Sequence, residues 1–230
     1  MNQDIRSGWT ANLPVAVSVM AYGSVLGVLA AQKEILWFQL LVMNVAVFAG
    51  SAQFVMVDMW TSALPVIEIT AAVLIMNLRY LLIGASLRPV FAGTSLSHKM
   101  GVMHFVADEN WAVTMAAHRK GGTNTWFLFG GGLCLMTAWT CGTLLGHRLG
   151  TAIQNPEAFA LDFAFIAVFT ALAFSMWQGK RNILPWTAAA VLAVLAEKYL
   201  PGKWYILIGG IGGAMLEAIL SKGTDHGNHG

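Results

Sequence analysis

Residues 12–31 read NLPVAVSVMAYGSVLGVLAA, a stretch of twenty residues without a single charge. A helix rises about 1.5 Å per residue, so this stretch is long enough to cross the roughly 30 Å hydrocarbon layer of a membrane. The rest of the 230-residue chain has the same character, because 57% of its residues are hydrophobic and 10% are charged. Soluble domains carry about 25% charged residues, so this chain has too little polar surface to face water. The sequence therefore predicts an integral membrane protein.

Similar apolar runs recur along the chain. The expected spans are 12–31, 35–59, 63–87, 125–146, 158–177, 183–200 and 203–221. A further stretch at 100–118 is less apolar and places polar side chains at helical spacing along one stripe, namely His104, Asp108, Thr114 and His118. That pattern favours an amphipathic helix at the membrane interface over a span. We predict an all-α, polytopic bundle of about seven spans that forms one integral domain in the lipid bilayer.

The two halves of the chain share short matches at a nearly constant offset. GSVLG at 23–27 is matched by GTLLG at 142–146, LP at 64–65 by LP at 184–185, and RYL at 79–81 by KYL at 198–200. These matches predict a duplicated three-span unit, with repeat 1 at 12–87, a connector at 88–124, repeat 2 at 125–221 and a polar tail at 222–230. With seven spans, the basic residues divide eight to four between the two faces, which favours a cytoplasmic carboxyl terminus and an inverted repeat.

Inverted repeats place their substrate site near the midplane, where interrupted helices expose backbone groups. Gly50, Ser51, Ala52 and Gln53 lie deep in the apolar run that begins at Leu36, and this cluster of small residues predicts such an interruption. The alternative is tight helix packing, with Gln53 bonded to a neighbouring helix.

Arg79 lies about eight residues from the end of the expected third span, a depth of roughly 12 Å. A charge at that depth costs at least about 2.5–3.5 kcal/mol unless a partner or a wet cavity compensates it. Asn77 and Tyr80 flank this arginine and are candidates to contact a ligand. The alternative is a structural salt bridge to another helix, with Asp108, Glu109 or Asp162 as the partner.

Five residues are candidates to carry a coupled proton. Asp108 and Glu109, followed by Asn110, form the only dense polar cluster with apolar flanks, and His104 stands about one helical turn before Asp108. Glu68 shares a helix face with Arg79, and Asp162 lies near the start of the expected fifth span. The alternative is that these side chains belong to a solvated face or to the membrane interface.

Several classes of protein are excluded by what the sequence lacks. With 13 Lys+Arg against 11 Asp+Glu there is no basic patch, so we expect no nucleic-acid partner. The sequence contains no HExxH, GxSxG or GxxxxGK[ST] motif, and no metal-ligand spacing surrounds Cys134 and Cys141. We therefore expect no enzyme, no metal and no cofactor, and any active transport must draw on an ion gradient or a separate subunit.

Four motifs in order carry a family resemblance: FAGSAQF at 48–54, NLRY at 77–80 with GASLRP at 84–89, DE at 108–109, and LDFA at 161–164. Their order and spacing resemble the AzlC family, the large subunit of bacterial branched-chain amino acid exporters, from about Gly8 to Leu220. The resemblance implies a multi-pass permease of the bacterial cytoplasmic membrane that works with a small AzlD-type membrane subunit. It also implies proton-driven export of valine, leucine and isoleucine, and in some members of methionine.

Such a cargo is a zwitterion with an apolar side chain. Arg79 or helix amino ends can bind its carboxylate, and backbone carbonyls near Gly50, together with Gln53, can bind its ammonium group. The expected substrate-binding residues are Gly50, Ser51, Gln53, Phe54, Asn77, Arg79 and Tyr80. We expect Arg79→Ala and Gln53→Ala to lose export while still inserting in the membrane. The alternatives are a permease for another small solute and a membrane scaffold that transports nothing.

Overall fold

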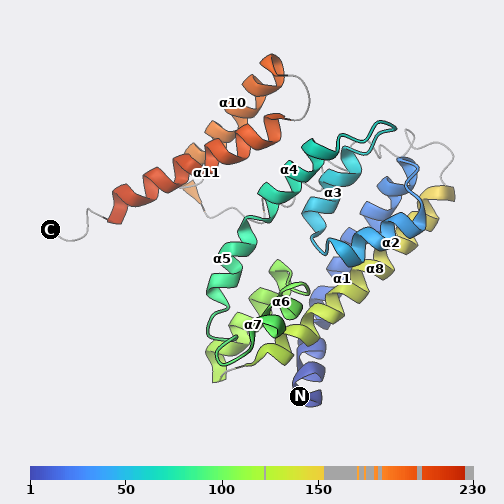
Figure 1. Ribbon diagram of the computed structural model, residues 1–230, viewed down its shortest axis with the longest axis vertical. Helices are drawn as coiled ribbons and strands as arrows, with labels where there is room; N and C mark the ends of the chain where they lie inside the picture. The colour runs from blue at the N-terminus through green and yellow to red at the C-terminus, as the bar shows by residue number, and fades with distance from the viewer. Residues whose placement is uncertain are drawn as a thin grey trace. The chain divides into compact units, whose positions relative to one another are not determined.

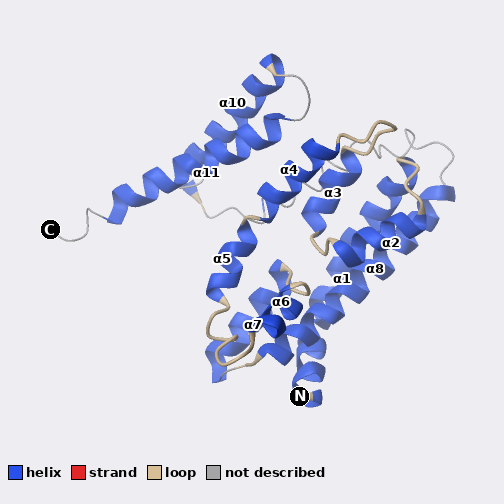
Figure 2. Cartoon of the chain, in the orientation of Figure 1, coloured by secondary structure: helices blue, strands red, loops and turns tan. Residues whose placement is uncertain are grey.

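The computed structural model describes residues 1–121, 123–152, 183–200 and 204–225, together with 170, 174 and 179–180. These residues form helices without strands (Figure 2). Within the part of the chain that the structure describes, three helical stretches are long and apolar enough to cross a membrane: Asn2–Gln32, Val66–Ser86 and Thr125–Ala152. Outward-facing side chains such as Val17 and Leu82 are 73% and 77% exposed, as lipid-facing residues would be. The all-α membrane bundle is confirmed, whereas one of the seven expected spans, 35–59, is not a continuous helix.

The chain divides into two compact units. The first unit contains Met1–Thr61 and Asn77–Phe165, and the second contains Ser62–Met76 and Ile166–Gly230. Most of the expected span at 158–177, including Asp162 and the LDFA motif, lies outside the described residues, as do residues 226–230 of the polar tail.

The centre of the first unit is a pair of long helices, α1 (Asn2–Gln32) and α8 (Thr125–Ala152), which lie side by side (Figure 1). Glycines on both helices let the two backbones touch. A Cβ atom on Gly27 would collide with the carbonyl of Thr143, and one on Gly146 would collide with the carbonyl of Ser24. Close approach through small residues is the usual basis of tight helix pairing in membranes.

These contacts also fix the direction of the two helices. Gly8 lies against Phe127 and Gly150 lies against Val28, so α1 and α8 run parallel. Moving along the sequence by 119 residues turns the Gly27–Thr143 contact into its counterpart between Gly146 and Ser24. This reciprocity supports a duplication for these two helices, related by an axis along their length. The inverted arrangement is wrong for this pair, because inverted copies would run antiparallel.

The expected span at 35–59 is also wrong, since it folds into two short helices, α2 (Trp37–Ala46) and α3 (Gly50–Asp58). The turn after α1 includes Glu34, whose φ of 57° lies in the left-handed region. At the far end of α3 the Lys33 ammonium donates to the Asp58 carbonyl at 3.1 Å. The hairpin therefore starts and finishes at the same end of α1, and this segment does not cross.

The other end of α8 is covered by α5 (Arg79–Ser86), α6 (Leu96–Met103) and α7 (Asp108–Gly121). Their apolar side chains form one buried cluster with Leu128, which includes Ile83, Leu87, Val90, Phe91, Val102 and Val106. The single amphipathic helix expected at 100–118 is wrong, because the chain leaves the helix between Met103 and Asp108. His104 and Asp108 therefore share no helical stripe.

The second unit contains residues 66–76 of α4 (Val66–Asn77) and a pair of helices, α10 (Ile183–Tyr199) and α11 (Trp204–Asp225). Gly209 lies against Ala193 and Gly213 lies against Pro185, so α10 and α11 pack antiparallel. These helices agree with the spans expected at 183–200 and 203–221 to within four residues at each end.

Candidate functional site

The tip of the α2–α3 hairpin is a break in the helix, as the small-residue cluster at 50–53 predicts. The break itself lies at residues 47–49, where Val47 and Ala49 have non-helical backbone angles, and Gly50 already begins α3. The first backbone hydrogen bond of α3 runs from the N–H of Gln53 to the carbonyl of Ala49. The amides of residues 50–52 therefore lack a helical partner and leave partial positive charge at the tip.

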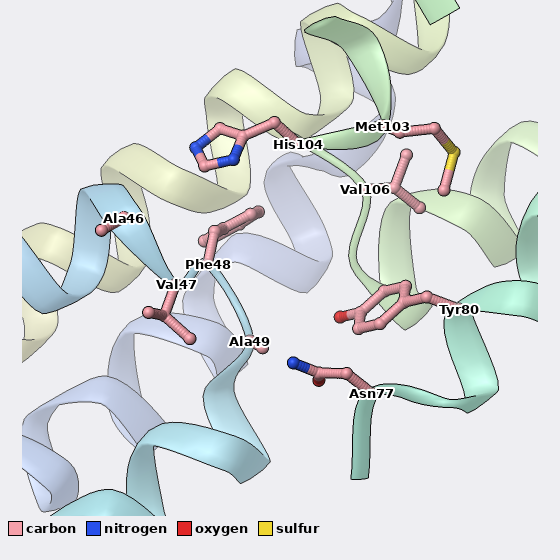
Figure 3. A pocket seen from close by; sticks show the side chains of 9 residues that line it. All are labelled: Ala46, Val47, Phe48, Ala49, Asn77, Tyr80, Met103, His104 and Val106. Carbon is pink, nitrogen blue, oxygen red and sulfur yellow. The ribbon is translucent and has the colours of Figure 1, made fainter. Parts of the chain in front are cut away.

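A cavity of about 230 Å³ lies at this tip (Figure 3). Its lining comes from α2, the break, Asn77, α5 and the α6–α7 turn, with Ala46, Val47, Phe48, Ala49, Asn77, Tyr80, Met103, His104 and Val106. The Asn77 and Tyr80 side chains point toward the break, while Met103 and Val106 supply apolar wall. The volume is slightly below the roughly 300–1,000 Å³ of pockets for drug-sized ligands, which suits a small solute.

His104 is tied to the hairpin. Its Nε2 lies 2.8 Å from the carbonyl oxygen of Val45, in the last turn of α2. A carbonyl only accepts, so Nε2 carries the hydrogen in this contact. The imidazole thus donates a hydrogen bond to one of the carbonyl groups that have no partner within the last turn of a helix.

Three helices meet at the Arg79 guanidinium. Its Nη2 donates to the Ser51 hydroxyl of α3 at 3.0 Å, and its Nη1 pairs with Oδ2 of Asp108 in α7 at 2.9 Å. The two charged side chains are 33% and 43% exposed, so the pair is not sealed in dry protein. The structure therefore brings together Ser51, Arg79 and Asp108, and the salt bridge to Asp108 is one of the pairings considered from the sequence.

This pair leaves hydrogen-bonding capacity unused. Among the described residues, Oδ1 of Asp108, Nε of Arg79 and Oδ1 of Asn77 are shielded from water and have no hydrogen-bond partner. A covered polar atom without a partner costs about 1–3 kcal/mol. Two acceptors and one donor of this kind therefore lie on Asp108, Asn77 and Arg79, of which Asn77 lines the cavity.

Gln53 has different surroundings from those expected of a ligand-binding residue. It is fully buried, its Nε2 donates to Oδ1 of Asn44 at 3.2 Å, and its Oε1 accepts from the indole of Trp139 at 2.6 Å. Asn44 in turn donates to the hydroxyl of Thr143 at 2.7 Å. Both ends of the Gln53 amide are therefore used in joining the hairpin to α8, and Gln53 is not among the cavity-lining residues.

The remaining expected residues lie around this centre or apart from it. Phe54 is buried in an edge-to-face contact with Trp139, and Gly50 packs against the same indole. Glu68 belongs to the second unit. Glu109 is exposed as a residue, yet its carboxyl group is partly desolvated by the surrounding protein, which raises its pKa. The negative charge of Asp108 raises the pKa of Glu109 further.

Asn110 belongs to the polar cluster at 108–110, and the structure bonds its side chain to the turn that precedes Asp108. It is fully buried; its Oδ1 accepts from the N–H of Ala107 at 2.7 Å, and its Nδ2 donates to the carbonyl of Phe105 at 2.9 Å. A second carbonyl, that of Leu128 in α8, lies 3.2 Å from the same nitrogen. Its signal in the sequence is an uncharged amide beside two acids at the start of a helix, a common capping pattern.

The sequence of the chain is similar to those of known proteins. The family model described as AzlC protein matches residues 14–153. The branched-chain amino acid transport protein AzlC of Bacillus subtilis is 23% identical over 204 residues, which cover 88% of this chain and 79% of that protein. Membrane proteins of two Helicobacter pylori strains are 22% and 21% identical, with 88% of this chain and 89% of each relative covered. No solved structure matches the chain.

Proposed function

Because this chain belongs to the AzlC family, we propose that it is the large subunit of a two-component permease that exports branched-chain amino acids. The substrates are valine, leucine and isoleucine, with methionine as a further candidate. The permease works in the bacterial cytoplasmic membrane, together with a small AzlD-type subunit, and takes its energy from the proton gradient. It does so as a transporter and not as an enzyme.

The single observation that carries this proposal is the broken hairpin with a cavity at its tip. Broken helices in transporters direct their amino ends at anionic substrate groups. Here the free amides of α3 and the Arg79 guanidinium converge on Ser51, so a substrate carboxylate finds partial and full positive charge at one place. We assign Gly50, Ser51 and Arg79 to this carboxylate.

The apolar side chain of the substrate goes to the other wall of the cavity. Val47, Phe48, Met103 and Val106 line it, and none of them offers a hydrogen bond from its side chain. A branched aliphatic side chain is compatible with such a wall, whereas a polar side chain would lose its contacts with water there. Tyr80 and Asn77 close the cavity on the side of α5.

Counterflow of labelled valine in proteoliposomes tests the proposal, with the full-length chain reconstituted with and without the AzlD-type subunit. Arg79→Ala should lower valine counterflow by about tenfold or more, since a hydrogen bond to a charged group contributes about 1.5–3 kcal/mol. Arg88→Ala is the matched control, because Arg88 is an exposed arginine at the end of α5. Normal counterflow by Arg79→Ala would contradict the site, and uptake of another solute from a labelled panel would contradict the substrate.

A further inference from the structure

The unused atoms around the Arg79–Asp108 pair match the groups of a zwitterion. An ammonium group has hydrogens to donate, and the unpartnered acceptors are Oδ1 of Asp108 and Oδ1 of Asn77. A carboxylate accepts, and the unpartnered donor is Nε of Arg79. The two charges of the ion pair are also complementary to those of an amino acid, because Arg79 can bind its carboxylate and Asp108 can bind its ammonium group.

Other acceptors for an ammonium group are already engaged. Both ends of the Gln53 amide are bonded inside the protein, and the Val45 carbonyl is taken by His104. Gln53, which the sequence predicted as a partner of the ammonium group, is therefore not free to bind it. Asp108 offers instead a full negative charge, one oxygen without a partner and partial exposure.

We propose that Asp108, assisted by Asn77, binds the ammonium group of the substrate, and that the same carboxylate binds the transported proton in the alternate step. This inference rests on the proposed function and adds to it the ammonium subsite and the residue that couples transport to protons. The substrate opens the ion pair, with its carboxylate on Arg79 and its ammonium group on Asp108.

Proton and substrate then exclude one another, which is the condition for exchange. An ionised Asp108 holds the ammonium group, whereas a protonated Asp108 has lost the charge that attracts it. On the more acidic outer side, one proton forms an O–H bond on Asp108 and the amino acid leaves with its own protons. On the inner side that O–H bond breaks, the proton passes to water, and the carboxylate is free for the next substrate.

The charged and titratable groups around Asp108 are Arg79 and Tyr80 from α5 and Glu109 from α7. Arg79 contacts the Asp108 carboxylate directly. Glu109 is the neighbouring carboxyl group and therefore the matched control. His104, four residues earlier, is bonded to the hairpin through Val45.

The test measures valine binding to the full-length protein from pH 8 down to pH 3, by displacement of labelled valine. In the wild-type protein, valine should bind more weakly as the pH falls, with a limit of about tenfold per pH unit for one proton that excludes the substrate. Asp108→Asn should weaken valine binding by about tenfold or more and make it independent of pH. Glu109→Gln should keep the pH dependence of the wild-type protein.

Two analogues show that the variant still folds and locate the effect. 3-Methylbutanoate is valine without its ammonium group, so Asp108→Asn should bind it at least as well as the wild-type protein does. Isobutylamine lacks the carboxylate, so its binding should fall in Asp108→Asn and also in Asn77→Ala.

The outcomes separate this inference from the proposed function. Valine counterflow by the wild-type protein, combined with unchanged pH dependence in Asp108→Asn or lost pH dependence in Glu109→Gln, would overturn the role of Asp108 alone. Absence of valine counterflow in the wild-type protein would overturn the proposed function itself.

Discussion

Gln53 shows how one buried amide can hold a transport element in place without touching the cargo. Its two ends join Asn44 in α2 and Trp139 in α8, so the hairpin is fixed at a level near the middle of α8. The Trp139 indole also covers Gly50 and Phe54. The position of the α3 amino end, and therefore of the carboxylate subsite, depends on this one network.

Gln53→Leu should destabilise the protein and displace the amino end of α3, although Gln53 itself does not line the cavity. The change leaves the Trp139 N–H and one oxygen of Asn44 buried without a partner, at a cost of about 1–3 kcal/mol each. We expect a lower melting temperature in detergent and a loss of counterflow through misplacement of α3. Gln3→Leu, at an exposed position, is the control. An unchanged melting temperature with altered preference among amino acids would instead place Gln53 in direct contact with substrate.

The helical segments show where sequence reasoning succeeds and where it stops. Runs of apolar residues gave α1, α8, α10 and α11, because each is a continuous helix of membrane length or close to it. The same reasoning failed at 35–59, because a helix that crosses the membrane and a hairpin that turns back can have equally apolar sequences. Contacts with distant residues, such as His147 bonded to the Ile35 carbonyl at 2.7 Å, decide between these two paths.

The candidate site was predictable to the same extent. Arg79 and Asp108 stand out in the sequence because charge in an apolar stretch needs a reason. Arg79 pairs directly with Asp108 and also binds Ser51, so the site depends on three segments meeting, and no local pattern encodes that meeting. Gln53 was placed on the substrate for the same reason: the sequence shows a polar residue beside a helix break, but not Asn44 and Trp139 on its two sides.

The α1–α8 pair makes a testable claim about helix packing. Gly146→Ala adds a Cβ atom that collides with the backbone carbonyl of Ser24, which a side-chain rotation cannot relieve. Overpacking typically lowers the free energy of unfolding by about 1–3 kcal/mol, and we expect a larger decrease here. It should be seen as a much lower melting temperature or as loss of the monodisperse protein. Gly101→Ala in α6 meets no neighbouring atom and should be neutral or stabilising, because alanine favours helix over glycine by about 1 kcal/mol. Equal melting temperatures for the two variants would contradict the close α1–α8 contact.

Parallel α1 and α8 change the path of the chain through the membrane. Within the first unit, the hairpin returns to the end of α1, whereas α5, α6 and α7 cover the beginning of α8, so the chain changes ends between Thr61 and Asn77. The connector then does not need to cross for α8 to start at the end where α1 begins. The charge count assumed that 35–59 crosses the membrane, so it does not apply to this path, and the face on which the connector lies stays a prediction.

Cysteine labelling from either side of the membrane distinguishes the two paths, with Cys134 and Cys141 first replaced by serine. Ser7 lies near the beginning of α1, and Gly121 lies shortly before the beginning of α8. Thr61 follows the end of α3, and Thr151 lies at the end of α8. Each of these four residues is replaced by a single cysteine. The structure predicts that Ser7→Cys and Gly121→Cys react from one face, and Thr61→Cys and Thr151→Cys from the other. Seven spans with an inverted repeat would place Thr61→Cys and Thr151→Cys on the face of Ser7→Cys, and Gly121→Cys alone opposite. Because three of the four positions change their grouping relative to Ser7, a membrane-impermeant maleimide applied to whole cells and to inside-out vesicles decides between them.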